Sequence, residues 1–305
     1  MKFAPIIIFS YNRPKHLKKT LCYLKKNRLS KKSEIFFFSD GPKSKNKKDL
    51  KKINSVKKII KNTNGFKKKN FIFHKKNIGL KKNILGGVSH VLKKYPHAIV
   101  LEDDIIVGKY FLDYMNQGLN FYKNKKKIWH ISGWNYDFKI YGTDFQNYNT
   151  FFTKNMNCWG WATWKNRWKR IITDPDFFIK KMNNKKIYDF NFSNSLNNWS
   201  QLMRNKKNKL NTWAIFWNAT IFYHNGLCLN PVKSLVKNIG FDGSGENSFP
   251  QQDDKSKISN TKNFLFSKKL KENFDLRDKI IFHMKQRNKK EKWNYIKKKI
   301  LSIFD

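Results

Sequence analysis

Four short apolar runs alternate with helix-like segments over the first hundred residues, and this alternation restricts the folds open to the chain. The apolar runs occupy residues 5–9, 35–38, 71–73 and 98–101. Between them apolar residues recur at helical spacing, as at Leu17, Leu21 and Leu24. This order predicts an α/β fold with a mostly parallel sheet and helices on both of its faces. Sheets of this kind bind ligands beyond the carboxyl ends of their strands.

The rest of the chain has three parts of different character. Residues 128–230 are rich in Asn, Trp and other aromatic residues and lose regular periodicity, so we interpret them as the walls of a substrate cleft. Within them Trp161, Trp164 and Trp168 have the spacing of one helical face, which favours a core position. Residues 251–270 form a polar connection, and 279–305 form a basic helix. We expect one domain over 1–250 and a helical C-terminal extension over 251–305.

The C-terminal helix has two interpretations. Trp293, Ile296 and Ile300 recur near helical spacing among many lysines. In the first interpretation this helix packs on the domain. In the second it lies on an anionic membrane surface, because an amphipathic helix with cations beside its apolar residues suits that environment.

The net charge of +44 first suggests a nucleic-acid partner. Only 7 of the 65 cationic residues are Arg, however, and proteins that read phosphates and base edges favour Arg. We therefore expect no nucleic-acid partner and interpret most of the charge as a solvated lysine surface. The apolar fraction of 39% excludes an intrinsically disordered chain.

Cysteine usage and hydropathy predict a compartment. Cys22, Cys158 and Cys228 are far apart and have neither metal-ligand spacing nor the pattern of a disulfide framework, which favours a reducing environment. No apolar run reaches the roughly 18 residues of a transmembrane helix. We expect a cytoplasmic protein, with peripheral attachment to the inner face of the membrane as an open alternative.

Three consecutive acids, Glu102, Asp103 and Asp104, follow the fourth apolar run of a chain that is otherwise poor in acids. Adjacent carboxylates repel each other unless a cation compensates them. A divalent metal such as Mg²⁺ or Mn²⁺ does so well, because it prefers hard oxygen ligands and accepts phosphate oxygens as well. The alternative is a solvated turn neutralised by nearby lysines.

Several segments together resemble one enzyme family. The segment around the triplet, YPHAIVLEDDIIVGKYFLDYM, is similar to the donor site of the Golgi N-acetylglucosaminyltransferases that start complex N-glycans, and to bacterial sugar transferases of polysaccharide loci. Further similar segments follow the family order over residues 4–245: IIIFSYNRP, FFFSDGP, NIGLKKNILGGVSHVL, IWHISGWN, CWGWATWKNRW and LNPVKSLVKNIGFDGSG. The resemblance implies a GT-A fold, which is Rossmann-like, and a nucleotide-sugar glycosyltransferase.

The resemblance also implies roles for particular residues. Asp104 would bind the metal, Mn²⁺ or Mg²⁺, while Asp103 would contact the ribose and Glu102 the surroundings of the base. Asp40 would contact the nucleobase, and Arg13 would lie near the nucleotide. The late segment would cover the diphosphate with Ser234, Ser244 and the glycines on either side of Ser244, since backbone N–H groups of such a turn bind phosphate.

The catalytic base and the acceptor site are less clearly marked. An inverting transferase needs a base for the acceptor hydroxyl, but Asn211 and Ala214 stand where the resemblance predicts a carboxylate. Asp242 and Glu246 are the nearest acids in sequence and our candidates. The alternatives are a shifted alignment and an inactive relative. For the acceptor and sugar cleft we predict Trp134, Asn135 and Trp159.

Together with these residues, the resemblance implies a metal-dependent, inverting transfer of a sugar from a nucleotide-diphosphate donor, a UDP-sugar, to a glycan or lipid-linked acceptor. Lipopolysaccharide, capsule or glycoprotein assembly are the expected settings. A non-catalytic nucleotide-sugar-binding protein is one rival, because the base is missing. A basic nucleic-acid-binding protein is the other, and it would bind independently of Asp104 and lose affinity steeply with salt.

Overall fold

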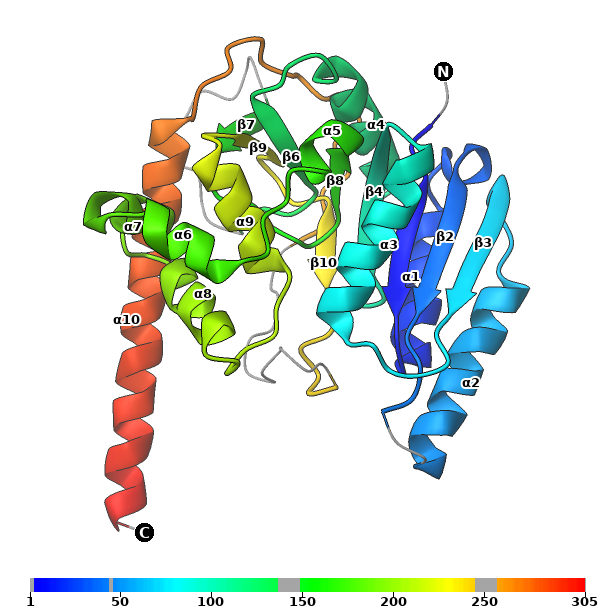
Figure 1. The fold of residues 1–305 in the computed structure, drawn as a ribbon, viewed down its shortest axis with the longest axis horizontal. Coiled ribbons are helices and arrows are strands. Elements are labelled where there is room, and N and C mark those ends of the chain that lie inside the picture. Colours follow the sequence, from blue (N-terminus) through cyan, green and yellow to red (C-terminus); the bar gives the residue numbers. More distant parts are fainter. Residues whose placement is uncertain (1–2, 44–45, 137–148, 245–256, 305) are drawn as a thin grey trace.

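The computed structural model describes residues 3–43, 46–136, 149–244 and 257–304 (Figure 1). The elements expected in the first hundred residues are all present, in the predicted order. They are β1 (Ile6–Ser10), α1 (Pro14–Lys25), β2 (Glu34–Ser39), α2 (Lys47–Asn62), β3 (Lys68–Phe73), α3 (Leu80–Lys94) and β4 (His97–Glu102). A short 3-10 turn, Ser30–Lys32, precedes β2. Pro14 occupies the first turn of α1, where its missing N–H costs no helical hydrogen bond.

The second half of the chain contains shorter elements. They are β5 (Ile105–Val107), α4 (Phe111–Phe121), β6 (Ile128–Ser132), β7 (Thr150–Thr153), β8 (Trp161–Trp164), α5 (Lys165–Trp168), α6 (Pro175–Lys181), α7 (Asn184–Phe190), α8 (Asn198–Lys206), α9 (Ala214–Tyr223), β9 (Leu227–Pro231), β10 (Val236–Asn238) and α10 (Phe274–Phe304). The segment interpreted as cleft walls therefore also supplies strands of the sheet.

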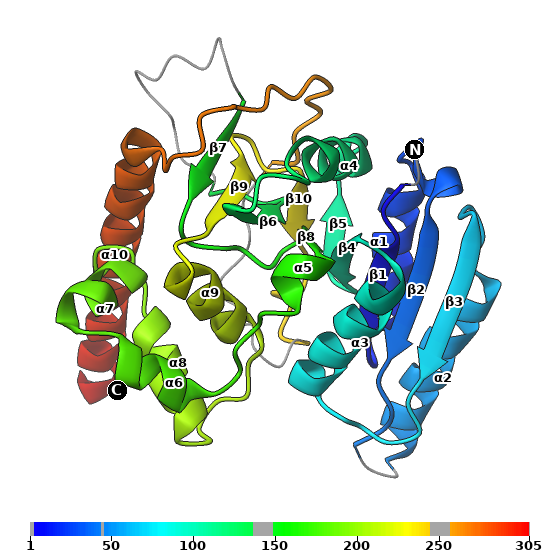
Figure 2. The same cartoon turned by 45° about the horizontal axis from the view of Figure 1, so that its top comes forward.

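Eight strands form one sheet in the order β3-β2-β1-β4-β8-β6-β9-β7. Strands β3, β2, β1 and β4 run parallel, while β8 runs antiparallel to both β4 and β6. β9 pairs parallel with β6 and antiparallel with β7 (Figure 2). A separate antiparallel pair joins β5 and β10. The predicted α/β fold with a mostly parallel sheet is confirmed.

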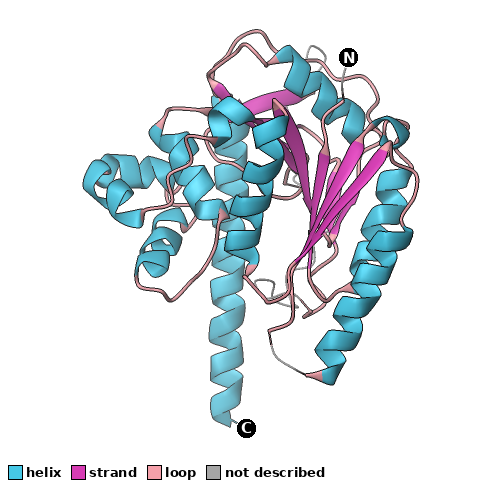
Figure 3. Cartoon of the chain, turned by 45° about the vertical axis from the view of Figure 1, so that its right-hand side comes forward, coloured by secondary structure: helices cyan, strands magenta, loops and turns pink. Residues whose placement is uncertain are grey.

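Strand β1 is buried on both faces, and its alternating side chains serve two hydrophobic cores. Ile6 and Ile8 pack in a cluster with residues of α1, α2 and α4. Ile7 and Phe9 pack on the other face with residues of α3 and α9. Side chains of a strand alternate between faces, so a continuous apolar run fits a sheet that is covered on both sides, as Figure 3 shows.

The three tryptophans predicted to share a helical face are buried, but their geometry differs from the prediction. Trp161 and Trp164 lie on strand β8, and Trp168 lies on the short helix α5 that follows. Their exposed fractions are 1%, 3% and 2%. Spacing of three and four residues thus correctly predicted burial while misidentifying the secondary structure.

The C-terminal residues pack against the domain before α10 leaves it. Phe264 and Phe266 contact the core cluster of α1 and α4, and Tyr122 donates a hydrogen bond to the carbonyl of Ser267. Leu276 and Ile280 of α10 pack in a cluster with Phe151 of β7 and with Phe192 and Val232. Within the described ranges, no helix is long and apolar enough to cross a membrane.

Candidate donor-binding site

A cavity of about 610 Å³ opens beyond the carboxyl ends of β1, β2 and β4. Its lining comes from segments far apart in sequence: residues 9–13, 40–43, 46–49, 77–83, 102–104, 158–159, 212–214 and 238–244. The cavity has the position predicted from the strand order, because the parallel strands end at the same edge of the sheet.

The acidic triplet forms one wall of this cavity. Glu102 ends β4, and Asp103 and Asp104 form the turn that leads into β5. Arg13, directly before α1, donates hydrogen bonds to the carboxylates of both aspartates, at 2.9 Å for Nη1 to Asp104 Oδ2. The Tyr11 amide also donates to Asp103 Oδ2, at 3.3 Å. The alternative interpretation, a solvated turn neutralised by lysines, is therefore wrong, since Asp103 and Asp104 are 2% and 7% exposed.

The cluster carries more negative than positive charge. Burial, and then the neighbouring carboxylate of Asp104, raise the pKa of Glu102 to about 8. Burial also raises the pKa of Asp103 to about 6, against the opposing effect of Arg13. A pKa near 8 leaves Glu102 mostly protonated at neutral pH, so Asp103 and Asp104 share one guanidinium, and their remaining negative charge favours a further cation.

Residues 234–244, which include β10 and which we call the late loop, lie against the same carboxylates. β10 pairs with β5, and the Ile239 amide donates a hydrogen bond to the Asp104 carbonyl at 2.9 Å. Gly240 lies so close to Asp104 that a Cβ atom there would collide with Asp104 Oδ2. A Cβ atom on residue 240 would also lie 3.1 Å from Asn238 Oδ1. A glycine is therefore needed where the loop approaches the carboxylate.

The oxygens at this position fit a divalent cation that is shared with a phosphate. Among the described residues no group of three or more His, Cys, Asp or Glu side chains could hold a metal alone. One or two carboxylates completed by substrate phosphates are a common site for Mg²⁺. Both carboxylate oxygens of Asp103 accept hydrogen bonds, Oδ1 from Arg13 and Oδ2 from the Tyr11 amide, whereas Arg13 reaches Asp104 at Oδ2, so Asp104 is the residue that would hold the metal.

Two further carboxylates hold together other segments that line the cavity. Asp40 accepts hydrogen bonds from the backbone amides of Ile78, at 2.9 Å, and Gly79, at 3.0 Å. Asp49 accepts from the hydroxyl of Tyr11 and the side-chain amide of Asn12, both at 2.7 Å. Asp40 lines the cavity as predicted, and it also joins two loops. Sequence analysis missed Tyr11, Asn12 and Asp49, although an acid in the first turn of a helix was a visible signal.

The late-loop residues predicted to cover the diphosphate divide into two groups. Ser244 lines the cavity and donates a hydrogen bond to Asp242 Oδ1 at 2.6 Å. Asp242 also lies 3.1 Å from His16 Nε2 of α1, and its side chain is 52% exposed. The Ser244 hydroxyl lowers the pKa of Asp242. Ser234, in contrast, is buried and donates to the Val236 carbonyl, outside the cavity lining. Glu246 lies outside the described residues.

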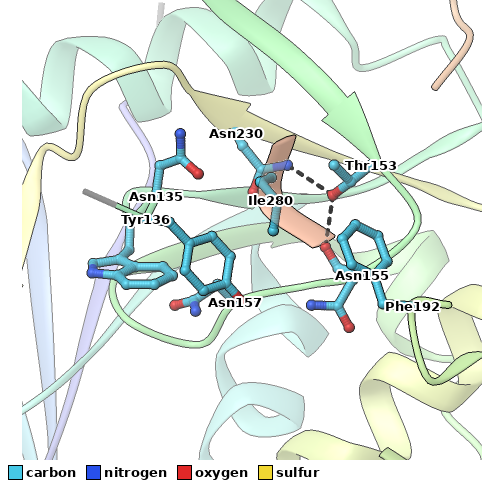
Figure 4. Close-up of a pocket in the computed structure, with 9 residues that line it drawn as sticks. Asn135, Tyr136, Thr153, Asn155, Asn157, Phe192, Asn230 and Ile280 are labelled. Atoms are coloured by element: carbon cyan, nitrogen blue, oxygen red, sulfur yellow. Dashed lines mark hydrogen bonds between the residues drawn. The ribbon is translucent and has the colours of Figure 1, made fainter. Parts of the chain in front are cut away.

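The predicted acceptor residues are also separated. Trp159 lines the large cavity. Trp134 and Asn135 instead line a neighbouring pocket of about 20 Å³, which has room for about one water molecule (Figure 4). Trp134 packs edge-on against Trp159 with ring centroids 4.8 Å apart. Trp134 thus supports the cavity wall from behind, and the polar pocket is too small for a sugar.

The cavity wall at which the resemblance predicts the catalytic base carries no carboxylate. Thr212, Trp213 and Ala214 line the cavity at the start of α9, beside the half-buried Cys158. None of these four residues is a carboxylate. Burial, and then Glu102, raise the pKa of Cys158, so its thiol stays protonated and is a poor nucleophile.

A family comparison agrees with this site. The GNT-I family model matches residues 1–177, more than half of the chain. The chain belongs to the GNT-I family. Membership confirms the resemblance predicted from sequence, and with it a glycosyltransferase of GT-A fold. The matched residues of this GNT-I family member include Arg13 and the acidic triplet, while the late loop lies beyond them.

Solved structures share only remote likeness with the chain. TarS of S. aureus has 18% identity and a TM-score of 0.30, over 43% of this chain and 21% of that chain. The mannosyltransferase PcManGT from Pyrobaculum calidifontis, in complex with GDP-Man and Mn²⁺, has 10% identity and a TM-score of 0.42, over 72% and 69% of the two chains. This chain thus spans about a fifth of the TarS chain. A comparison with curated proteins finds no match.

Proposed function

We propose that the chain transfers a sugar from a nucleotide-diphosphate donor, a UDP-sugar, to a glycan or lipid-linked acceptor, with inversion and with Mn²⁺ or Mg²⁺. One observation carries the proposal: three carboxylates and Arg13 meet in a 610 Å³ cavity at the end of β4. A cavity of this size lies within the usual range of ligand pockets. Lipopolysaccharide, capsule or glycoprotein assembly would supply such acceptors.

In this proposal each part of the cavity has a distinct task. Tyr11 and Asp49 border the part that would receive the nucleoside. Arg13, Ser244 and the amides around Gly243 would position the diphosphate, because donors of this kind bind phosphate oxygens. Asp104 would hold the cation, which when bound neutralises the charge of the leaving nucleoside diphosphate. Trp159 would give the sugar an aromatic surface.

Asp242 remains our candidate for the base. Its carboxylate accepts a hydrogen bond from Ser244, which lines the cavity, and it is half exposed, so an acceptor can approach it. His16 and the Ser244 hydroxyl orient the carboxylate. A general base acts by taking the proton of the acceptor hydroxyl as the new glycosidic bond forms.

A second function is favoured by the apolar wall at α9. Because Thr212, Trp213 and Ala214 offer no carboxylate, the protein could bind a nucleotide sugar without turning it over. The alternative function is therefore that of a protein that binds a nucleotide sugar without catalysis. A nucleic-acid partner is not part of either proposal, and we propose a cytoplasmic location.

Calorimetry of nucleoside diphosphates with Mn²⁺, Mg²⁺ or chelator tests donor binding. We expect UDP to bind only with metal, and Asp104→Asn to weaken binding at least about 10-fold, which corresponds to 1.4 kcal/mol. Asp176→Asn is the matched control, since Asp176 is an exposed acid paired with Lys206 outside the cavity. Absence of nucleotide binding with every metal would exclude both proposed functions.

Turnover separates the two functions. Release of nucleoside diphosphate from a nucleotide sugar, lost in Asp242→Asn while donor affinity is retained, supports transfer with Asp242 as base. Tight metal-dependent binding without release, for every donor and acceptor tested, favours the non-catalytic alternative.

A further inference from the structure

The loop between β1 and α1 consists of three residues, and all three of its side chains are hydrogen-bonded to acids. The Tyr11 hydroxyl and the Asn12 side-chain amide both donate to Asp49, at 2.7 Å each. Arg13, the third residue, donates to both aspartates of the acidic turn after β4. The loop is therefore held from two sides, by Asp49 of α2 and by the acidic turn.

Both carboxylate oxygens of Asp49 take part in this contact. Oδ2 accepts from the Tyr11 hydroxyl and Oδ1 from the Asn12 amide, 38 and 37 residues away in sequence. Asp49 lies in the first turn of α2, and α2 begins at the sheet edge where β1 and β2 end (Figure 1). All three residues line the donor cavity, so the contact joins two parts of its wall.

The sequence around Asp49 offers it closer partners. Asp49 is one of three acids in the first hundred residues, and four lysines lie within three residues of it. Exposed pairs of lysine and carboxylate contribute little to stability. The carboxylate instead accepts from two neutral side chains of a distant loop, which a solvated acid does not do. Burial, and then this hydrogen bond, raise the pKa of Tyr11, so its hydroxyl stays protonated and remains a donor.

The loop conformation also bears on the other end of the cavity. The Tyr11 amide donates to Asp103 Oδ2 at 3.3 Å, so the same residue contacts Asp49 through its side chain and Asp103 through its backbone. Arg13 follows two residues later and directly precedes Pro14, the first residue of α1. A shift of Tyr11 and Asn12 would therefore be transmitted over two peptide bonds to Arg13.

We propose that Asp49 is a positioning residue of the donor site, which holds the loop of residues 11–13 so that Arg13 is presented to the donor diphosphate. Ordering a loop has an entropic cost. Where Asp49 fixes the loop in the free protein, this cost does not reduce the affinity for the donor. The inference rests on the proposed function, because it assigns Arg13 to donor binding.

Calorimetric titration of the full chain with UDP and Mn²⁺ tests the proposal. We expect Asp49→Ala to weaken metal-dependent UDP binding at least about 10-fold, because the loop must then be ordered on binding. Asp176→Ala is the matched control, since Asp176 is also an acid in the first turn of a helix but lies outside the cavity. We expect this control to bind within about twofold of the wild type.

A mutant cycle separates positioning from direct contact with the ligand. Tyr11→Phe/Asn12→Ala removes both donors to Asp49, so adding Asp49→Ala to this background should change UDP affinity by less than about twofold. A further loss of about 10-fold in that background would overturn the proposal, because Asp49 would then act without these two residues. Urea unfolding shows which variants are folded at the assay temperature. If Asp49→Ala is not, Asn12→Ala replaces it, since it breaks one of the same bonds and should weaken binding in the same direction.

The wild type separates this inference from the function on which it rests. If the wild type binds UDP with metal and Asp49→Ala binds it equally well, the positioning role alone is overturned. If the wild type binds no nucleotide with any metal, the proposed function fails and the inference fails with it.

Discussion

His130 is expected to make the folded protein sensitive to mild acid. The ring lies on β6 with no exposed surface. Its Nε2 lies 2.9 Å from the carbonyl of Asn157, which can only accept, and its Nδ1 lies 3.3 Å from the indole N–H of Trp217, which can only donate. These partners fix the neutral tautomer with the proton on Nε2. A second proton on Nδ1 would face the Trp217 N–H.

The size of the effect follows from proton linkage. Burial lowers the pKa of His130 to about 3, while an unfolded histidine titrates near 6.5. Between these values the unfolded chain holds one proton more than the folded protein, so stability falls as pH falls. Each pH unit below about 6.5 costs about 1.4 kcal/mol, which sums to about 2.5 kcal/mol between pH 7 and pH 4.5.

Urea unfolding followed by tryptophan fluorescence, repeated from pH 7 to pH 4.5, measures this contribution. Glutamine can keep both hydrogen bonds without titrating, so the stability difference between wild type and His130→Gln should shift by about 2.5 kcal/mol toward the variant across this range. His90→Gln, at an exposed position on α3, controls for loss of a histidine as such. Parallel pH profiles of wild type and His130→Gln would refute the assignment of a buried neutral ring.

Further substitutions test the core and the site. Gly86→Ala should stabilise by about 0.5–1 kcal/mol in urea unfolding, because its Cβ meets nothing within 4 Å and α3 gains helix propensity. Gly87→Ala should destabilise by about 1–3 kcal/mol in the same assay, since its Cβ would lie 2.6 Å from a buried phenylalanine ring. Arg13→Met should cost about 3–5 kcal/mol by leaving buried carboxylates unpaired, as thermal and urea unfolding can show. Gly240→Ala should weaken metal-dependent UDP binding in calorimetry at least about 10-fold, because its Cβ collides with Asp104.

The N-terminal half of the fold could be predicted because its signals are local. Each apolar run of the first hundred residues forms a strand: β1, β2 and β4 are buried, and β3 lies at the edge of the sheet. Each connecting helix has one apolar side that packs on the sheet. The start of α1 at Pro14 follows from the same kind of signal. Local sequence was not sufficient for α6: residues 174–176 alone indicate a turn, but Asp174 accepts a hydrogen bond from the Asp176 amide at 2.9 Å and caps a helix.

The later strands depend on partners that are distant in sequence. β9 pairs with β6 from about 100 residues away, and β10 pairs with β5 from about 130 residues away, so no local period marks them. The same distance explains the site predictions. The acidic triplet was recognisable alone, but the clash that requires Gly240 and the burial of Ser234 depend on how the late loop crosses β5. Whether Trp134 faces the cavity or supports Trp159 is likewise set by tertiary packing.

The place of β9 in the sheet has a consequence for synthesis. β9 lies between β6 and β7, and β7 has no other neighbour in the sheet order of the described residues. During translation β6 and β7 therefore leave the ribosome long before Leu227 begins the strand that joins them. Until then both carry unpaired backbone edges next to apolar side chains, a state that favours aggregation. The nascent chain should need a chaperone until residue 231 has emerged, and its yield should depend on translation rate between these strands.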